Sequence, residues 1–114
     1  MSIRRIEPGR RMSAAVIHGN TVYLAGQVGN PGDDVTQQTQ TVLAEIDRLL
    51  AEAGTDKSKL LSTTIWLADM KDFGAMNAVW DAWVDPANPP ARATGESALA
   101  GPEYRVEIIV VAAI

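Results

Sequence analysis

Apolar residues in the first quarter of the chain fall into short runs, which predicts β-strands. The runs cover residues 3–6, 13–17 and 21–24, and the tripeptide HGN at 18–20 separates the last two. A glycine and an asparagine at that place favour a tight turn, so we expect a β-hairpin. The segment GNPGD at 29–33 then interrupts the regular structure.

A helical period follows the interruption, because apolar residues recur there at steps of three and four. The stripe consists of Val35, Val42, Ile46, Leu49, Leu50 and Ala53. Asp34 is placed to cap the N-terminus, and Gly54 stands where a C-cap glycine is expected. We therefore predict a first helix from Val35 to Ala53.

The second half of the chain predicts one more helix between strands. Residues 60–67 are rich in β-branched and aromatic side chains, which is typical of a strand. A second apolar stripe consists of Phe73, Met76, Trp80, Trp83 and Val84, and prolines at 86, 89 and 90 end this helix. Residues 92–97 and 104–114 supply the last strands. The predicted order is βββαβαββ, in a single domain that spans residues 1–114.

The last strand is apolar on both faces, which bears on assembly. Tyr104, Val106, Ile108 and Val110 share one face, and Glu107, Ile109, Val111 and Ala113 share the other. Two helices cover only one face of a sheet, so the second face needs another cover. Other copies of the same chain are the simplest one. We predict a mixed α+β sheet with two helices on one face, in a closed homo-oligomer.

Composition narrows the function further. The chain has 114 residues, a net charge of -4 and no cysteine. A net acidic chain offers no broad basic surface for nucleic acid phosphates, so nucleic acid is not an expected partner. The absence of cysteine excludes disulfides and fits a reducing compartment. No apolar segment follows the N-terminal charges, so we expect a soluble, cytoplasmic protein without a signal peptide or membrane span.

Arg92 is the first candidate for chemistry. It follows two prolines that restrict the backbone, and its neighbours Ala93, Thr94 and Gly95 are small enough to leave room for a ligand. A buried arginine can hold a carboxylate through two parallel hydrogen bonds. The structural alternative is a salt bridge to an internal acid such as Glu96 or Glu107.

Glu107 is the second candidate, because it interrupts the apolar run that ends the chain. An unpaired charge on an apolar strand face is costly, so such a glutamate requires a partner or a function. It can hold or direct a proton at a reacting group. The alternative is a pair with Arg105 on the same face.

Two further residues are weaker candidates. Gly26, with Gln27, is expected to end the second hairpin strand, either as a simple bulge or as a point where the backbone approaches a ligand closely. Asn77 lies on or beside the stripe of the second helix and either caps a loop or braces the arginine. The three tryptophans are predicted to belong to the core. The sequence has no metal-ligand cluster, no dinucleotide fingerprint and no Ser-His-Asp arrangement.

Taken together, these segments resemble the RidA (YjgF) family. Five motifs follow one another in the family order: GNTVYLAGQVG, LLAEAGTD, MNAVWDAWV, PPARATG and VEI. The resemblance spans essentially the whole chain. It implies a chorismate-mutase-like α+β fold and a homotrimer around a central β-barrel, with three ligand clefts between subunits. It also implies hydrolysis of reactive enamines and imines, such as 2-aminoacrylate and 2-iminopropionate, to 2-keto acids and ammonia without a cofactor or metal.

The resemblance assigns roles to several residues of this sequence. Arg92 matches the arginine that grips the substrate carboxylate, Glu107 the glutamate that places the attacking water, and Gly26 a backbone contact to the substrate. Asn77 matches an asparagine near the site. The chain also departs from the family pattern at three substrate-binding positions: Ala25 stands in place of a serine, Met12 in place of a tyrosine, and Thr94 in place of a cysteine.

These departures leave competing functions open. One alternative to the deaminase is a regulatory protein that senses a 2-keto acid or related carboxylate in the same cleft without turning it over. Another is the chaperone-like or nuclease activity of some relatives, although the acidic charge balance argues against a nuclease.

Overall fold

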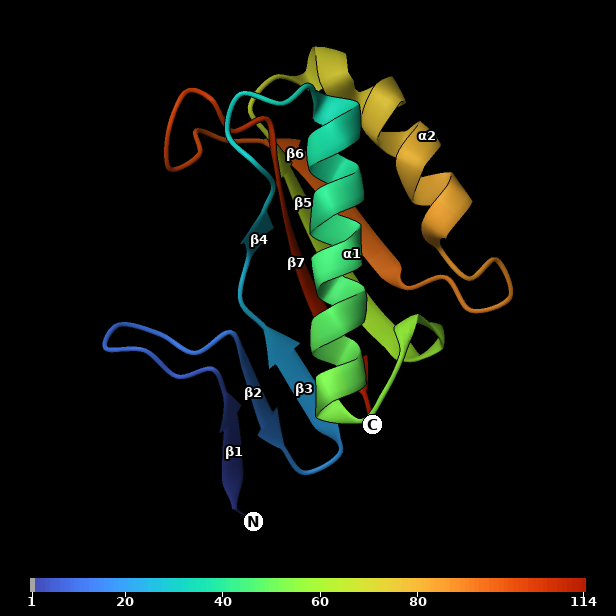
Figure 1. The fold of residues 1–114 in the computed structure, drawn as a ribbon. Helices are drawn as coiled ribbons and strands as arrows, with labels where there is room; N and C mark the ends of the chain where they lie inside the picture. Colours follow the sequence, from blue (N-terminus) through green and yellow to red (C-terminus); the bar gives the residue numbers. More distant parts are fainter. Residues whose placement is uncertain (1) are drawn as a thin grey trace.

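The computed structural model describes residues 2–114, which form one seven-stranded mixed sheet with two helices on one of its faces (Figure 1). The strands are β1 (Ile3–Ile6), β2 (Ala15–His18), β3 (Thr21–Leu24), β4 (Gln27–Val28), β5 (Leu60–Leu67), β6 (Ala91–Glu96) and β7 (Val106–Ala113). The sheet order is β1-β2-β3-β7-β5-β6, and β4 pairs with β7 beyond the end of β3. Among the strand pairs formed by residues 2–114, the β5–β6 pair alone is parallel. The predicted mixed α+β architecture is confirmed.

The first helix, α1 (Val35–Ala53), has the predicted bounds because both of its caps form. The Asp34 side chain accepts a hydrogen bond from the Gln37 backbone N–H at 2.8 Å, and the Gln37 side chain accepts one from the Asp34 N–H at 3.2 Å. At the other end Gly54 adopts the left-handed conformation with φ 89°. All six residues of the predicted stripe are buried against the sheet.

The second helix, α2 (Phe73–Trp83), belongs to a crossover that joins the parallel strands β5 and β6. Short 3₁₀ turns, η1 (Lys57–Lys59) and η2 (Met70–Asp72), precede β5 and α2. The predicted apolar stripe of α2 is only partly buried. Met76 and Trp80 are buried, but the Phe73 side chain is 39% exposed. No helix formed by residues 2–114 is both long and apolar enough to cross a bilayer.

The two helices cover one face of the sheet and leave the other face exposed. On β7, alternate residues from Val106 to Ala112 are fully buried beneath the helices, whereas Glu107 and its face-mates are half-buried. The uncovered face also includes Tyr23, 51% exposed, and Trp66, 37% exposed. Trp66 therefore does not belong to the core of this chain, contrary to prediction. The predicted doubly apolar β7 with helices on one side only is confirmed (Figure 1).

Strand β4 was not predicted, and it changes the surroundings of Gly26. The hairpin strand β3 ends at Leu24, and Gln27 begins a separate two-residue strand that pairs with Ile108 and Glu107. Gly26 thus lies between two strands rather than at the end of one. This brings the 25–26 segment beside β7.

A buried polar network fixes the start of β7. The Gln38 side chain on α1 is fully buried, donates to the carbonyls of Asp33 and Glu103 at 2.9 Å each, and accepts from the Arg105 N–H at 2.8 Å. The Arg105 guanidinium donates two bonds to Asp72, at 2.7 and 3.0 Å. The alternative in which Arg105 pairs with Glu107 is therefore wrong.

Candidate functional site

Arg92 projects from the edge strand β6 toward α2. Its Nη1 donates a hydrogen bond to Oδ1 of Asn77 at 2.8 Å. Its guanidinium carbon lies 5.5 Å from the ring centroid of Trp80 and 6.0 Å from that of Phe73. These three residues of α2 are spaced by four and three positions, so they share one helix face. The helix thus orients the guanidinium by one charge-assisted hydrogen bond and two cation–π contacts.

The charge of Arg92 is not neutralised by this chain. Across residues 2–114, the ion pairs found involve Arg48 and Arg105 but not Arg92. Glu96, one proposed partner, instead accepts a hydrogen bond from the Met70 N–H at 3.0 Å. Arg92 is exposed in the single chain, because it belongs to the edge strand β6; burial of its guanidinium where two subunits meet stays a prediction. A cation that is oriented but unpaired can bind an external carboxylate.

Thr94 lies two residues beyond Arg92 on the same face of β6 and is half-buried. Its hydroxyl is enclosed but has no hydrogen-bond partner among the described residues. Thr94 and Asn77 are both neighbours of Arg92, Thr94 along β6 and Asn77 through its hydrogen bond. These three of the predicted site residues are thus brought together.

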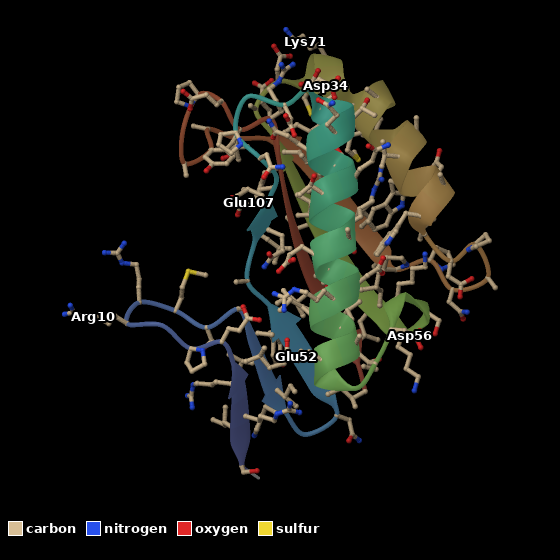
Figure 2. The ribbon with its side chains drawn as sticks, viewed as in Figure 1. Arg10, Asp34, Glu52, Asp56, Lys71 and Glu107 are labelled. Atoms are coloured by element: carbon tan, nitrogen blue, oxygen red, sulfur yellow. The ribbon has the colours of Figure 1, made fainter. Side chains whose placement is uncertain are left out.

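Glu107 lies against Gly26. A Cβ atom at position 26 would come within 2.3 Å of Oε2 and 2.9 Å of Cδ of the Glu107 carboxylate, so glycine is needed for the carboxylate to occupy its present position. Figure 2 shows Glu107 beside β4, on the flank of the sheet away from α2. The neighbouring Ala25 carbonyl accepts a hydrogen bond from the Gln27 side chain at 2.9 Å. The approach of a ligand to the Gly26 backbone stays a prediction; within this chain the group nearest to Gly26 is the Glu107 carboxylate.

The two groups lie on opposite faces of the sheet. Arg92 is the register partner of Thr63, which is 2% exposed beneath the helices. Glu107 is the register partner of Trp66, which belongs to the uncovered face. Register partners share a face, and residues three apart on one strand do not. Although β6 and β7 are consecutive in the chain, β5 also separates them in the sheet.

Met12 belongs to neither group. It lies in the loop between β1 and β2, where its carbonyl accepts a hydrogen bond from the Gly9 N–H at 2.8 Å and its side chain is 58% exposed. The loop projects from the body of the molecule, as Figure 1 shows in blue. One chain therefore presents the seven predicted site residues at three separate places.

Comparison with known proteins decides the family. The model of the Endoribonuclease L-PSP family matches residues 2–114. The chain belongs to this family, also called YjgF/RidA. It is 47% identical to a RutC family protein of Haemophilus influenzae, with 98% of each chain covered. It is 34% identical to a mouse protein named 2-iminobutanoate/2-iminopropanoate deaminase, with 88% of this chain and 78% of the mouse protein covered.

The fold places the chain in the YjgF/RidA family as well. A crystal structure of a YjgF family protein from Neisseria meningitidis superposes with a TM-score of 0.97 at 47% identity, covering 99% of this chain and 95% of that one. The family resemblance found in the sequence is therefore confirmed.

Two surface hollows of this YjgF/RidA chain each include one predicted site residue, Met12 in a hollow over residues 9–12 and Arg92 in one over the sheet. A groove of about 520 Å³ runs between α1 and α2, and none of the predicted site residues lines it. A shallower hollow of about 250 Å³ lies over β5 and β6. Its lining consists of Ser62, Thr63, Thr64, Ala91, Arg92 and Ala93. By strand alternation, four of these six side chains belong to the uncovered face, which is opposite to the face of Arg92.

The sequence missed two residues that orient Arg92. Phe73 and Trp80 were assigned to the core from their helical spacing. The same spacing places Asn77 on their face, since it follows Phe73 by four residues and precedes Trp80 by three. The sequence did contain one signal for this part of the site, because the polar Asn77 shares a helix face with the aromatic Phe73 and Trp80. Which strand they contact depends on tertiary structure.

Proposed function

We propose that this protein hydrolyses small 2-imino acids and their enamine tautomers to 2-keto acids and ammonia. The observation that carries the proposal is the state of Arg92, which is oriented by α2 yet has no carboxylate partner within residues 2–114. Such an arginine suits the carboxylate that every 2-imino acid has. The name of the mouse relative, a 2-iminobutanoate/2-iminopropanoate deaminase, supports the same substrate class.

Hydrolysis of an imine requires the protein to bind the substrate carboxylate, position a water molecule and transfer protons. Arg92 grips the carboxylate, and Glu107 orients a water molecule and accepts its proton as the oxygen bonds to the electrophilic imine carbon. The nitrogen takes up a proton, the carbon–nitrogen bond breaks, and ammonia leaves as the new hydroxyl loses its proton to form the ketone. Atoms and electrons balance with water as the only co-reactant, so the proposed reaction uses no cofactor.

We further propose that two copies of the chain build each site. Arg92 and Glu107 lie on opposite faces of one sheet, so one chain does not aim both at one substrate. The uncovered face, with Tyr23 and Trp66 exposed, offers an apolar surface for other copies. A homotrimer with a central barrel, as the family resemblance implies, would bring Arg92 of one copy to the Glu107 face of the next. We expect this homotrimer to act in the cytoplasm.

Mixing two inactive variants tests the shared site. Arg92→Ala and Glu107→Gln are each expected to be inactive alone as homo-oligomers. After joint refolding at equal amounts, activity should recover to about one quarter of the parental value, because random head-to-tail interfaces join both intact residues about once in four pairings. Two variants that form mixed oligomers without recovering activity would refute the shared site.

Single-variant kinetics test the deaminase itself. Arg92→Ala removes charge-assisted hydrogen bonds worth about 1.5–3 kcal/mol each, so kcat/KM for 2-iminopropionate should fall about a hundredfold or more. Arg92→Lys keeps the positive charge but cannot donate two parallel hydrogen bonds. Its kcat/KM should therefore lie between the values of the parent and of Arg92→Ala. The measurement is ammonia release from imine generated in place, against the uncatalysed rate.

Measurements on the same proteins also distinguish the deaminase from the alternative function, a sensor of 2-keto acids. If the parent binds 2-ketobutyrate in calorimetry but does not accelerate imine hydrolysis, the chain is a sensor of 2-keto acids. The observation that favours this second candidate is that Ala25 and Met12 stand where the family resemblance implies a serine and a tyrosine. If Arg92→Ala hydrolyses 2-iminopropionate like the parent, the deaminase site proposed here is wrong.

A further inference from the structure

We propose that Thr63 is an additional positioning residue of this site. Its hydroxyl, together with that of Thr94, holds a water molecule beside Arg92, and this water binds the carboxylate of the ligand. The inference rests on the proposed function, because it deepens the account of how the Arg92 side of the site recognises a carboxylate.

The first support is an unexplained polar group. Thr63 is 2% exposed, and its Oγ1 is buried without any hydrogen-bond partner. Thr94 Oγ1 is in the same state, and these are the two buried side-chain polar atoms within residues 2–114 found without a partner. A buried hydroxyl normally finds a partner, so two unpartnered ones in one neighbourhood need a reason.

The second support is the register around Thr63. On the β7 side its sheet partner is Val110, which has no polar side-chain atom, and on the β6 side its partner is Arg92. Thr94 has Ile65 as its partner on β5. Thr63 and Thr94 therefore lie beside Arg92 on the helix-covered face, and their register partners on β5 and β7 other than Arg92 are aliphatic. Glu96 follows Thr94 by two residues on the same face of β6, and one of its carboxylate oxygens accepts from the Met70 N–H. The polar neighbours of the two hydroxyls in the sheet are thus Arg92, with whatever it binds, and Glu96 beyond Thr94.

The third support is the chemistry of the group around Arg92. Valine has nearly the shape of threonine and would leave no hydroxyl to satisfy, so a purely structural position favours valine in a strand. A hydroxyl can donate and accept, and a buried water needs two to four polar partners. Two hydroxyls supply two of them, and a carboxylate on Arg92 supplies another. Ligand binding then completes the hydrogen bonding of the water, which strengthens binding rather than the chemical step.

The experiment compares Thr63→Val with Thr63→Ser and with Thr64→Val. Thr64 is the next residue of β5, on the other face, so it controls for the same substitution in the same strand. For Thr63→Val we expect a dissociation constant for 2-ketobutyrate about threefold to tenfold higher by calorimetry, with a midpoint of thermal unfolding at or above that of the parent. In imine hydrolysis, KM should rise while kcat changes less than about twofold. Thr63→Ser and Thr64→Val should bind like the parent.

The outcomes separate this inference from the proposed function. If the parent binds 2-ketobutyrate, Arg92→Ala does not, and Thr63→Val binds like the parent, only the role of Thr63 is wrong. If the parent binds none of the probe and hydrolyses no imine, the proposed function fails and this inference with it. Should Thr63→Val not fold, a crystal structure of the parent with 2-ketobutyrate decides. A water molecule shared by both hydroxyls and the carboxylate supports the proposal, and its absence from well-ordered density overturns it.

Discussion

Arg92 and Glu107 lie on opposite faces of one sheet with strand β5 between them. Arg92 sits beside Thr63 and beneath α2, whereas Glu107 sits beside Trp66 on the face that no helix covers. The cation and the acid that the proposed reaction requires thus leave a single chain in different directions. This separation is the reason for proposing that two copies of the chain build each site.

Gly26→Ala tests the contact between Gly26 and Glu107. The new methyl group would overlap the carboxylate, so the Glu107 side chain must move away from its present position. Displacement of a water-placing group by about 1 Å is expected to lower kcat about 10- to 100-fold. Because the side chain is flexible, the free energy of unfolding should change by less than about 1 kcal/mol.

Gly74→Ala is the matched control for that variant. A Cβ atom at position 74, in the first turn of α2, would meet nothing within 4 Å. Replacing a helical glycine by alanine should stabilise the protein by about 0.5–1 kcal/mol and leave turnover unchanged. Equal kcat in the Gly26→Ala variant and the parent would contradict the role given to Glu107.

Asn77→Ala tests how α2 orients Arg92. The variant removes the oxygen that accepts from Nη1 and leaves the aromatic contacts in place. We expect KM for 2-iminopropionate to rise about tenfold with a smaller change in kcat, since a loosened guanidinium holds the carboxylate less well in the ground and transition states alike. Asn88→Ala is the control, because Asn88 bonds Asp85 in the loop after α2. A KM unchanged by the loss of Asn77 would show that the aromatic rings alone set the orientation.

Gln38→Leu tests the network that fixes the start of β7. The side chain makes three hydrogen bonds while fully buried, so leucine would leave the Asp33 carbonyl and the Arg105 N–H without this partner, whereas the Glu103 carbonyl would keep its bond from the Gly32 N–H. The loss of these bonds from a partly buried network predicts a decrease of about 1–3 kcal/mol in the free energy of unfolding, measured in urea. Gln40→Leu, on the exposed side of the same helix, should stay within about 0.5 kcal/mol. Similar losses in both variants would mean that helix propensity, not the network, is being measured.

The pair of Glu45 and Arg48 predicts a dependence of stability on pH. The hydrogen bond from Arg48 holds the pKa of the Glu45 carboxyl below its ordinary value of 4.5. The folded chain therefore takes up this proton less readily than the unfolded chain. The pair stabilises the folded state above about pH 4.5, and this contribution is lost as the pH falls through the lowered pKa.

Arg48→Met should flatten that part of the stability curve. The dependence of stability on pH is measured by thermal unfolding between about pH 3 and 7, a range that spans the ordinary glutamate pKa of roughly 4.5. Arg11→Met is the control. The effect should be small and should weaken with added salt, since the pair is at the surface. Parallel curves for the parent and Arg48→Met would contradict the assignment.

Local signals in the sequence predicted most of the elements. Both caps of α1 involve residues adjacent to the helix, so its bounds from Val35 to Ala53 could be placed without tertiary information. The two-residue strand β4 could not, because a segment so short has no period. Phe73 was misplaced in the core for a related reason, since its spacing fixes its helix face but not the strand that this face meets.

Local sequence patterns specify the helices, most strands, the alternation along β7 and the candidate residues for binding a carboxylate and a water molecule. These properties depend on the chemistry of each side chain and on the repeat of its own element. The position of β5 between β7 and β6, and with it the placement of Arg92 and Glu107 on opposite faces, emerges in the folded chain alone. The order and register of strands come from pairings between distant segments, and no local period encodes them.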